Sequence, residues 1–344
     1  MASQGGTVVR HAALQAPALA GRTPTPPRFI ECPPTSGRPS PRAEIVSGLL
    51  KPQAAISPKF FYDDLGSHLF EAITLLDEYY PTRTEAAILR ANANEIALSA
   101  GPGTTLIDLG AGNCAKAASL FATLEPSSYV AVDISVEFVR RAVERLAASH
   151  PQIRMAGVGM DFSMSLELPE EIRRDIEDTR PLFFYPGSSI GNFAPDQAMA
   201  FLRRIQSQSR RGGLLIGVDL LKPAPVLERA YDDGLGVTAA FNRNILRNVN
   251  RIIGADFDPA KWRHVALFNQ VLSRVEMHLE ATEAMTAHWA DGERAFAAGE
   301  RIHTESACKY TVARFRTMLR DAGFRDVRNW CDEQERYVVF HAVN

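Results

Sequence analysis

The chain has 344 residues, of which 46% are hydrophobic, so it can bury a substantial core, and its length exceeds that of one compact domain; we expect two lobes. Its formal net charge of −2, with no long run of one sign, argues against nucleic acid as a partner. The four cysteines form no C-x-x-C pair, which argues against a disulfide framework and against a metal site.

No apolar stretch approaches the ~20 residues of a membrane span, and the N-terminus has no apolar signal core. We therefore expect a cytoplasmic protein with reduced thiols and no membrane contact. A monomer is the default expectation.

Residues 1–43 contain eight of the 21 prolines, which prevent regular helices and sheet ladders, so we predict a disordered tail. Five arginines against one acidic residue in this stretch are faintly typical of an organelle transit peptide, but the proline density disfavours that interpretation.

The stretch 57–85 is rich in phenols and carboxylates, with Tyr62, Tyr79 and Tyr80 as its main aromatic residues. Aromatic residues near helix boundaries usually pack in a core, and that interpretation is favoured. Lying ahead of a cofactor-binding turn, the same residues would also suit the mouth of a pocket.

A strand, a tight turn and a helix start are predicted at residues 104–116, where an apolar run ends in Asp108 and is followed by Gly110 and Gly112. Glycine lets the backbone bend and approach a ligand, and the helix start offers unpaired N–H groups, so the turn is typical of nucleotide-cofactor binding. The letters Gly-Ala-Gly-Asn-Cys-Ala also fit a loose dinucleotide fingerprint, so a nicotinamide cofactor stays open here.

Two acidic residues follow at the ends of the next predicted strands. Asp133 ends the strand 129–134 and suits the ribose hydroxyls of an adenosine, although a helix-capping Asp is the simpler interpretation. Asp161 and Phe162 follow a third strand near 153–157, where they suit an adenine amino group and ring.

The fourth strand, near 182–185, runs into Gly187, Gly191 and Asn192, which keep the backbone bare and offer one amide, as a reacting centre would need. A helix over 195–205 and a fifth strand over 212–221 come next.

About ninety residues then interrupt the alternation of strand and helix, too many for a simple connection. We predict helices within 226–262 and a half-exposed antiparallel strand at 275–281. A helix over 312–322 that ends at Gly323, and strands at 325–330 and 337–343, complete the chain.

Five strands, an insertion, then a helix and two strands is the order of a class I methyltransferase sheet, a Rossmann-like α/β fold whose last strand is antiparallel. This order favours S-adenosyl-L-methionine over a nicotinamide as the cofactor.

From about residue 57 to the C-terminus, the chain resembles the L-histidine N-alpha-methyltransferases of ergothioneine biosynthesis, which form hercynine. The resemblance rests on a set of short motifs that occur in order: FYDDLGSHLF at 61–70, EYYPTRTE at 78–85, DLGAG at 108–112, PGSSIGN at 186–192, AYDD at 230–233 and GVTAAFNRN at 236–244.

The resemblance implies the domain division and the roles of individual residues. A substrate lobe would comprise 44–85 and the insertion 222–305, with the methyltransferase core at 86–221 and 306–344. Cofactor contacts would fall on Gly110, Gly112, Lys116, Asp133, Asp161 and Phe162. The substrate's amine and carboxylate would be held by Tyr80, Asn192 and Tyr231, also the expected catalytic residues, with Gly187 lining the site, Met277 flanking the side chain and Glu305 accepting the imidazole N–H.

One position departs from the family pattern. The family typically carries a serine two residues after the glutamate as a second imidazole contact, whereas this chain has Ala307, with Ser306 next to Glu305. A register shift would let Ser306 substitute; otherwise one hydrogen bond, worth about 1 kcal/mol, is missing.

Other functions stay open at this point. A related enzyme methylates the amine of a prenylated tryptophan, and the less polar Ala307 is compatible with a different side chain. A non-catalytic S-adenosylmethionine-binding protein and a nicotinamide oxidoreductase are the alternatives from other classes.

Overall fold

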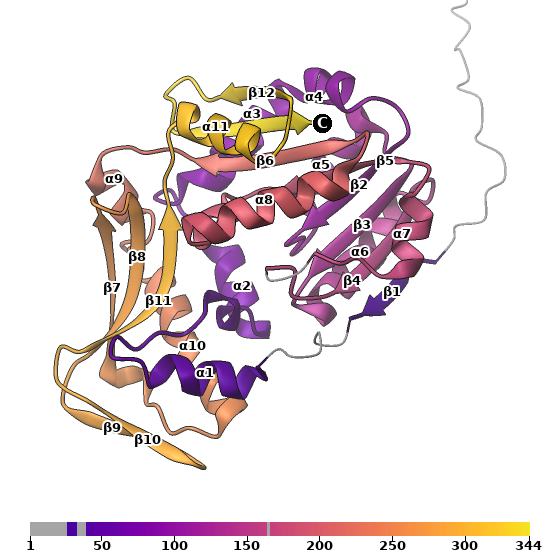
Figure 1. The fold of residues 1–344 in the computed structure, drawn as a ribbon. Coiled ribbons are helices and arrows are strands. Elements are labelled where there is room, and N and C mark those ends of the chain that lie inside the picture. The colour runs from indigo at the N-terminus through magenta and orange to yellow at the C-terminus, as the bar shows by residue number, and fades with distance from the viewer. Residues whose placement is uncertain (1–25, 33–38, 164–165) are drawn as a thin grey trace, which may run out of the picture.

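The computed structural model describes residues 26–32, 39–163 and 166–344. Its main feature is an eight-stranded sheet with the spatial order β1-β4-β3-β2-β5-β6-β13-β12 (Figure 1). The strands are β1 (Arg28–Glu31), β2 (Thr104–Leu109), β3 (Ser128–Asp133), β4 (Arg154–Gly159), β5 (Arg180–Tyr185), β6 (Gly213–Asp219), β12 (Asp326–Cys331) and β13 (Tyr337–Val343).

The sheet confirms the predicted class I methyltransferase fold. Strands β1 to β6 run parallel, whereas β13 lies antiparallel to both of its neighbours, β6 and β12. The strand order reverses outward from β2 and β5, and ligands of open α/β sheets bind at such a point, beyond the carboxyl ends of the strands.

Helices cover both faces of this sheet. On one face pack α3 (Tyr80–Ala91), α4 (Ala93–Ala100), α5 (Ala115–Leu124) and α6 (Val136–Ser149). On the other face pack α7 (Glu170–Ile176), α8 (Pro195–Ser209) and α11 (Val312–Asp321). As predicted, α11 stops before Gly323. The φ of Gly323 is +110°, a backbone conformation that glycine adopts without strain.

The predicted disordered tail over residues 1–43 is wrong in two places. Arg28–Glu31 form β1, which pairs in parallel with β4, and helix α1 (Pro41–Leu49) starts inside the expected tail, capped by the Ser40 hydroxyl. The short run Phe29–Ile30 supplies apolar side chains that pack against the sheet's two cores, which outweighs the surrounding prolines. Residues 1–25 and 33–38 of the predicted tail lie outside the described residues.

A second lobe is built from two separate parts of the chain, an N-terminal part and the insertion. Its three-stranded antiparallel sheet has the order β11-β8-β7, formed by β7 (Trp262–Asn269), β8 (Arg274–Ala281) and β11 (Arg301–Cys308). Against it lie α1, η1 (Pro58–Phe61) and α2 (Asp64–Ile73) from the N-terminal part, and α9 (Ala224–Arg229), α10 (Val237–Ile253) and η3 (Pro259–Lys261) from the insertion (Figure 1). A two-stranded hairpin of β9 (Met285–Trp289) and β10 (Gly292–Phe296) extends from this lobe.

Helix α10 holds the lobe together because its apolar residues recur at helical spacing. Phe241, Ile245 and Val249 are buried on one face, and Phe241 stacks on Phe61 with ring centroids 4.5 Å apart. The helix ends at Gly254, whose φ is +69°.

Two details of the insertion differ from the prediction. Strand β8 was expected to be half-exposed, but as the central strand it also buries Glu276 and His278 on its second face. Strand β11 stays in the lobe sheet as far as Cys308, so the expected boundary at residue 306 lies three residues too early.

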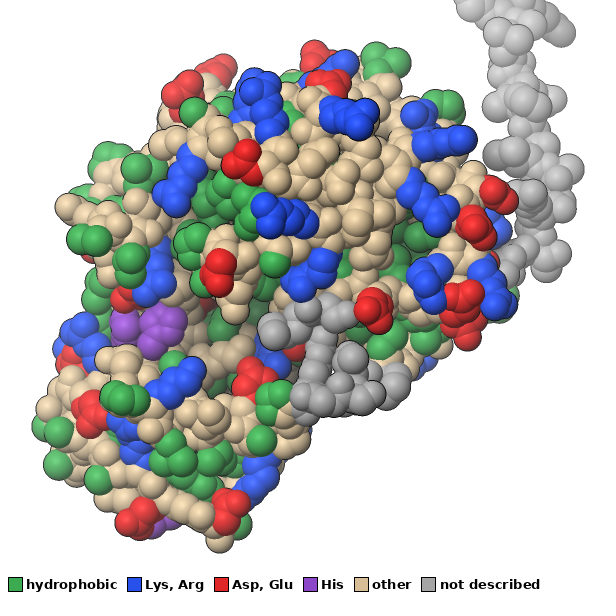
Figure 2. Space-filling model, viewed as in Figure 1, with side chains coloured by type: hydrophobic (Ala, Val, Ile, Leu, Met, Phe, Trp, Pro, Cys, Tyr) green, Lys and Arg blue, Asp and Glu red, His purple; other side chains and the backbone are tan. Residues whose placement is uncertain are grey.

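The visible surface carries charges of both signs in a mixed pattern, with no extended patch of one sign on this face (Figure 2). Within the described ranges, no helix is both long and apolar enough to cross a lipid bilayer.

Candidate active site

The glycine turn follows β2, at the point between β2 and β5 where the strand order of the main sheet reverses. Gly110 and Gly112 have φ values of +72° and +52°, and the N–H of Gly112 donates to Asp133 Oδ2 at 2.9 Å. The other oxygen of Asp133 accepts from Ser135 N–H at 2.8 Å. Burial raises the pKa of Asp133, although these backbone donors oppose the shift. The turn and the acid at the end of β3 are therefore joined by a hydrogen bond.

Asp161 and Phe162 lie beside this turn. A Cβ placed on Gly110 would come 3.7 Å from Phe162 Cζ, so the ring borders the turn directly. The Asp161 carboxylate is paired with Lys59 at 3.2 Å and hydrogen-bonded to Ser163. The pairing with Lys59, from η1 of the second lobe, links the two lobes beside the glycine turn.

Lys116, another of the predicted cofactor residues, is one of three groups in the described residues that donate to the buried carboxylate of Glu85. Its Nζ donates to Glu85 Oε2 at 2.7 Å, and the Gly187 N–H donates to the same carboxylate at 2.9 Å. The Tyr337 hydroxyl donates to Glu85 Oε1 at 2.8 Å. Glu85 is 1% exposed, and it thereby connects the start of α5 with the loop after β5.

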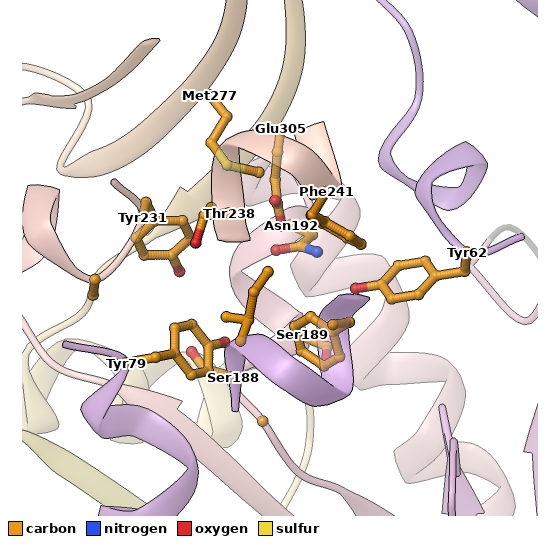
Figure 3. Close-up of a pocket in the computed structure, with 14 residues that line it drawn as sticks. Tyr62, Tyr79, Ser188, Ser189, Asn192, Tyr231, Thr238, Phe241, Met277 and Glu305 are labelled. Carbon is orange, nitrogen blue, oxygen red and sulfur yellow. The ribbon is translucent and has the colours of Figure 1, made fainter. Parts of the chain in front are cut away.

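A pocket opens between the two lobes, and the space in it, together with its open mouth, is about 500 Å³. Five of the six motifs on which the resemblance rests contribute residues to it, whereas DLGAG at 108–112 does not. Its lining consists of Tyr62, Phe70, Ile73, Tyr79, Gly187, Ser188, Ser189, Asn192, Ala230, Tyr231, Thr238, Phe241, Met277 and Glu305 (Figure 3).

Glu305 and Asn192 lie side by side in this pocket, with their polar ends toward each other (Figure 3). Burial raises the pKa of Glu305 to about 7, while Lys309 and a hydrogen bond from Asn192 act in the opposite direction. A buried carboxyl group whose pKa is shifted in this way, inside a pocket, marks a candidate for a binding or catalytic role.

Of the predicted substrate residues, five line the pocket together: Gly187, Asn192, Tyr231, Met277 and Glu305. They come from the loop after β5, from the segment that follows α9, and from the facing strands β8 and β11. Met277 and Glu305 are register partners in the lobe sheet, which explains why residues 28 positions apart share one site.

Tyr80 was predicted to hold the substrate, but it does not line the pocket. It lies on the buried face of α3, where Tyr80, Thr84 and Ile88 follow helical spacing, and its hydroxyl donates to the Asp219 carboxylate at 2.8 Å. The preceding Tyr79, outside the helix, takes the position in the pocket.

Ser306 was predicted as a substitute imidazole contact and is also absent from the pocket. Alternation along β11 turns it to the face opposite Glu305, where its hydroxyl lies 3.0 Å from His303 Nε2. Ala307 is on the same side as Glu305, but it is 4% exposed and packs with Leu227 and Val275.

Sequence reasoning passed over several pocket residues. Tyr62 and Tyr79 were interpreted mainly as core residues, and Thr238, Phe241 and Ser188 were not singled out. The helical period of α3 was the available signal for Tyr79, since it assigns Tyr80 to the core face and so leaves Tyr79 free to face the site.

Residues 41–344 match the model of a protein family described as histidine-specific, S-adenosylmethionine-dependent methyltransferases. This chain belongs to that family. The match covers both lobes, including the insertion and the pocket between them.

Curated relatives in this family span nearly the same length. The chain is 40% identical over 299 residues to a histidine N-alpha-methyltransferase of Mycolicibacterium smegmatis, covering 85% of this chain and 91% of the relative. It is 39% identical over 300 residues to the Mycobacterium tuberculosis protein of the same name, with the same coverages. A solved S-adenosylmethionine-dependent methyltransferase from Clostridium acetobutylicum is similar over 82% of this chain and 99% of its own, with 12% identity and a TM-score of 0.44.

Membership of the histidine-specific methyltransferase family distinguishes between the functions that the sequence alone left open. The chain is an S-adenosylmethionine-dependent N-methyltransferase, as the order of its strands predicted, and not a nicotinamide oxidoreductase. A non-catalytic cofactor-binding protein and a tryptophan-derivative methyltransferase are not favoured.

Proposed function

We propose that this protein transfers methyl groups to the α-amino group of free L-histidine and repeats the transfer until the trimethylated betaine, hercynine, is formed. The observation that carries this proposal is the position of Glu305, whose carboxyl group faces the interior of the pocket formed by both lobes. A carboxylate there offers an acceptor for an imidazole N–H.

The residues around the glycine turn fit S-adenosylmethionine. Gly110 and Gly112 give the backbone a close approach, and Asp133 retains lone pairs for two ribose hydroxyls. Asp161 and Phe162 would contact the adenine, and Lys116 would pair with the cofactor's carboxylate. When bound, the cofactor supplies a methyl group activated by a sulfonium.

The chain's own residues then have to align one nitrogen. Asn192, Tyr231 and the backbone at Gly187 would hold the amino-acid head, while Met277 flanks its side chain and Glu305 orients the ring. Fixing the amine beside the reacting centre removes the entropy of encounter, and this is the main contribution that such a site makes.

Aromatic faces suit the product of each transfer. Three aromatic rings of the pocket are in contact: Phe70 packs edge-on against Tyr62 and against Tyr79, with ring centroids 5.7 Å and 6.2 Å apart. Such faces attract a methylated ammonium, whose charge can no longer be removed by losing a proton. This arrangement supports repeated methylation in one pocket.

Mass spectrometry tests the proposal directly. The purified protein is incubated with S-adenosylmethionine and either L-histidine or a panel of other free amino acids, including tryptophan. We expect histidine to gain three methyl groups on its α-nitrogen, whereas the other amino acids gain none. Methylation of tryptophan with none of histidine would overturn the substrate assignment, and fewer than three methyl groups would overturn the degree of methylation.

A further inference from the structure

A buried lysine lies directly behind Tyr231. Lys309, the residue after β11, is 3% exposed, and its Nζ donates to the Tyr231 hydroxyl at 2.9 Å. The same Nζ pairs with Asp219 Oδ2 at 2.8 Å. Neither Lys309 nor Asp219 lines the pocket, whereas Tyr231 does.

Asp219 faces two lysines at once. Lys222 Nζ lies 2.6 Å from Asp219 Oδ1, on the other side of the carboxylate from Lys309. In the part of the chain that the structure describes, Asp219 is the one carboxylate within ion-pair distance of either lysine. Of these two lysines, Lys309 is the one that contacts Tyr231, so the charge next to the phenol oxygen is positive.

The chemistry of the ammonium group fixes the role of the phenol. A lysine ammonium can only donate, so the Tyr231 oxygen accepts from Lys309 and its own proton has to point elsewhere. Because the ring of Tyr231 borders the pocket, that proton is available to a ligand there (Figure 3). A donor backed by positive charge attracts a carboxylate and repels an ammonium.

We infer that Lys309 is a positioning residue that holds Tyr231 as a hydrogen-bond donor for the substrate's carboxylate, so that the pocket selects amino acids over the corresponding amines. The inference rests on the proposed function for the identity of the substrate as a free amino acid. In this arrangement Tyr231 binds the carboxylate of the substrate, and the amine lies on the side of the pocket away from Lys309.

The test compares histidine with histamine, the same molecule without the carboxylate. Dissociation constants for both are measured by calorimetry in the presence of S-adenosylhomocysteine, which requires no turnover. Lys309→Met should weaken histidine binding about tenfold, because a hydrogen bond to a charged group contributes at least a factor of about ten to affinity. The same substitution should change histamine binding by less than about twofold.

Lys222→Met is the matched control. It removes the same charge from the same carboxylate, but Lys222 contacts the Tyr80 hydroxyl at 2.7 Å and not Tyr231. Loss of a buried partner should lower the melting temperature of both variants, whereas the preference for histidine over histamine should fall only in Lys309→Met.

Tyr231→Phe provides a second route if Lys309→Met does not fold. This variant should lose the same preference by itself, and Lys309→Met should have no further effect on the preference in its background. An unchanged preference in Lys309→Met, or an equal loss in Lys222→Met, overturns the inference.

Failure of the proposed function gives a different result. If the unsubstituted protein binds tryptophan and not histidine, the substrate assignment is wrong, and the same comparison is made with tryptophan and tryptamine. A preference for the carboxylate-bearing ligand that survives Lys309→Met then overturns the role of Lys309 independently.

Discussion

The backbone N–H of Gly187 donates to both carboxylate oxygens of Glu85, at 2.9 Å and 3.1 Å, although 102 positions separate the two residues. Gly187 has a φ of +77°, and a Cβ there would lie 3.3 Å from Lys116 Nζ. Glu85 therefore holds the loop that leads to Asn192 in place relative to Lys116 beside the cofactor turn, and it does so from a buried position.

Replacing Glu85 by glutamine should weaken cofactor binding. The amide cannot form an ion pair with Lys116, and its NH₂ group would face the Gly187 N–H in one of its two orientations. We expect Glu85→Gln to raise the dissociation constant of S-adenosylhomocysteine about tenfold, measured by calorimetry, and to lower the melting temperature. Glu95→Gln, at an exposed carboxylate bonded to Trp330, is the control. Unchanged cofactor affinity in Glu85→Gln would contradict this role.

Glu305 should make stability depend on pH. Its pKa of about 7 in the folded protein exceeds the ordinary 4.5 of a glutamate, so the folded state holds the proton more tightly than the unfolded state. The contribution of this group to stability is therefore present at low pH and is lost as the pH rises from about 4.5 through 7. Glu305→Gln escapes that loss, so its melting temperature relative to the unsubstituted protein should rise between pH 5 and pH 8.

Thermal melts over this pH range check the expectation for Glu305. Glu283→Gln, which alters a glutamate paired with Lys261 at the surface, should show a constant difference from the unsubstituted protein. A constant difference for Glu305→Gln as well would show that Glu305 does not titrate near neutrality in the folded state.

Restoring the family's serine at position 307 should tighten histidine binding. Ala307 lies on the same side of β11 as Glu305, so a hydroxyl there is directed to the same side of the lobe sheet. A single added hydrogen bond of about 1 kcal/mol corresponds to a roughly fivefold lower KM for Ala307→Ser. The control is Ser306→Ala, which should leave KM unchanged because Ser306 contacts His303 on the opposite face. A higher KM in Ser306→Ala would mean that Ser306 reaches the substrate after all.

The two adjacent tyrosines should respond differently to loss of their hydroxyls. Tyr79 lines the pocket, so Tyr79→Phe should raise the KM for histidine severalfold with little change in melting temperature. Tyr80 donates to the buried Asp219, so Tyr80→Phe should lower the melting temperature and leave KM nearly unchanged. Steady-state kinetics and thermal melts of the two variants distinguish these outcomes, and the reverse pattern would exchange the roles assigned to the two residues.

Local sequence signals were sufficient for the central strands of the main sheet, β2 to β6, because these strands are largely apolar, buried and bounded by turns. The run Thr104–Leu109 is buried at every position, and Gly110 and Gly112 take the positive φ values that the turn requires. Strand β1 escaped prediction because its partner, β4, lies more than a hundred residues away, and pairing at that distance leaves no trace in local composition.

Pocket residues could be predicted where a motif indicated both the residue and the side of the helix or strand on which its side chain lies. Asn192 and Glu305 line the pocket, whereas Tyr80 and Ser306 are each one position away from a residue that does. A shift of one residue reverses the side of a strand and turns a helix by about 100°, so direction depends on the exact register of each element. That register is decided by tertiary packing.

Strand β1 has a consequence for association between molecules. Without it, β4 would present a row of unpaired backbone groups along the edge of a parallel sheet, a template on which another chain can form hydrogen bonds. With four residues, β1 is itself too short to offer much of an edge in turn. Proteolytic removal of residues 28–31 should therefore leave the pocket residues in place while making the protein prone to aggregate.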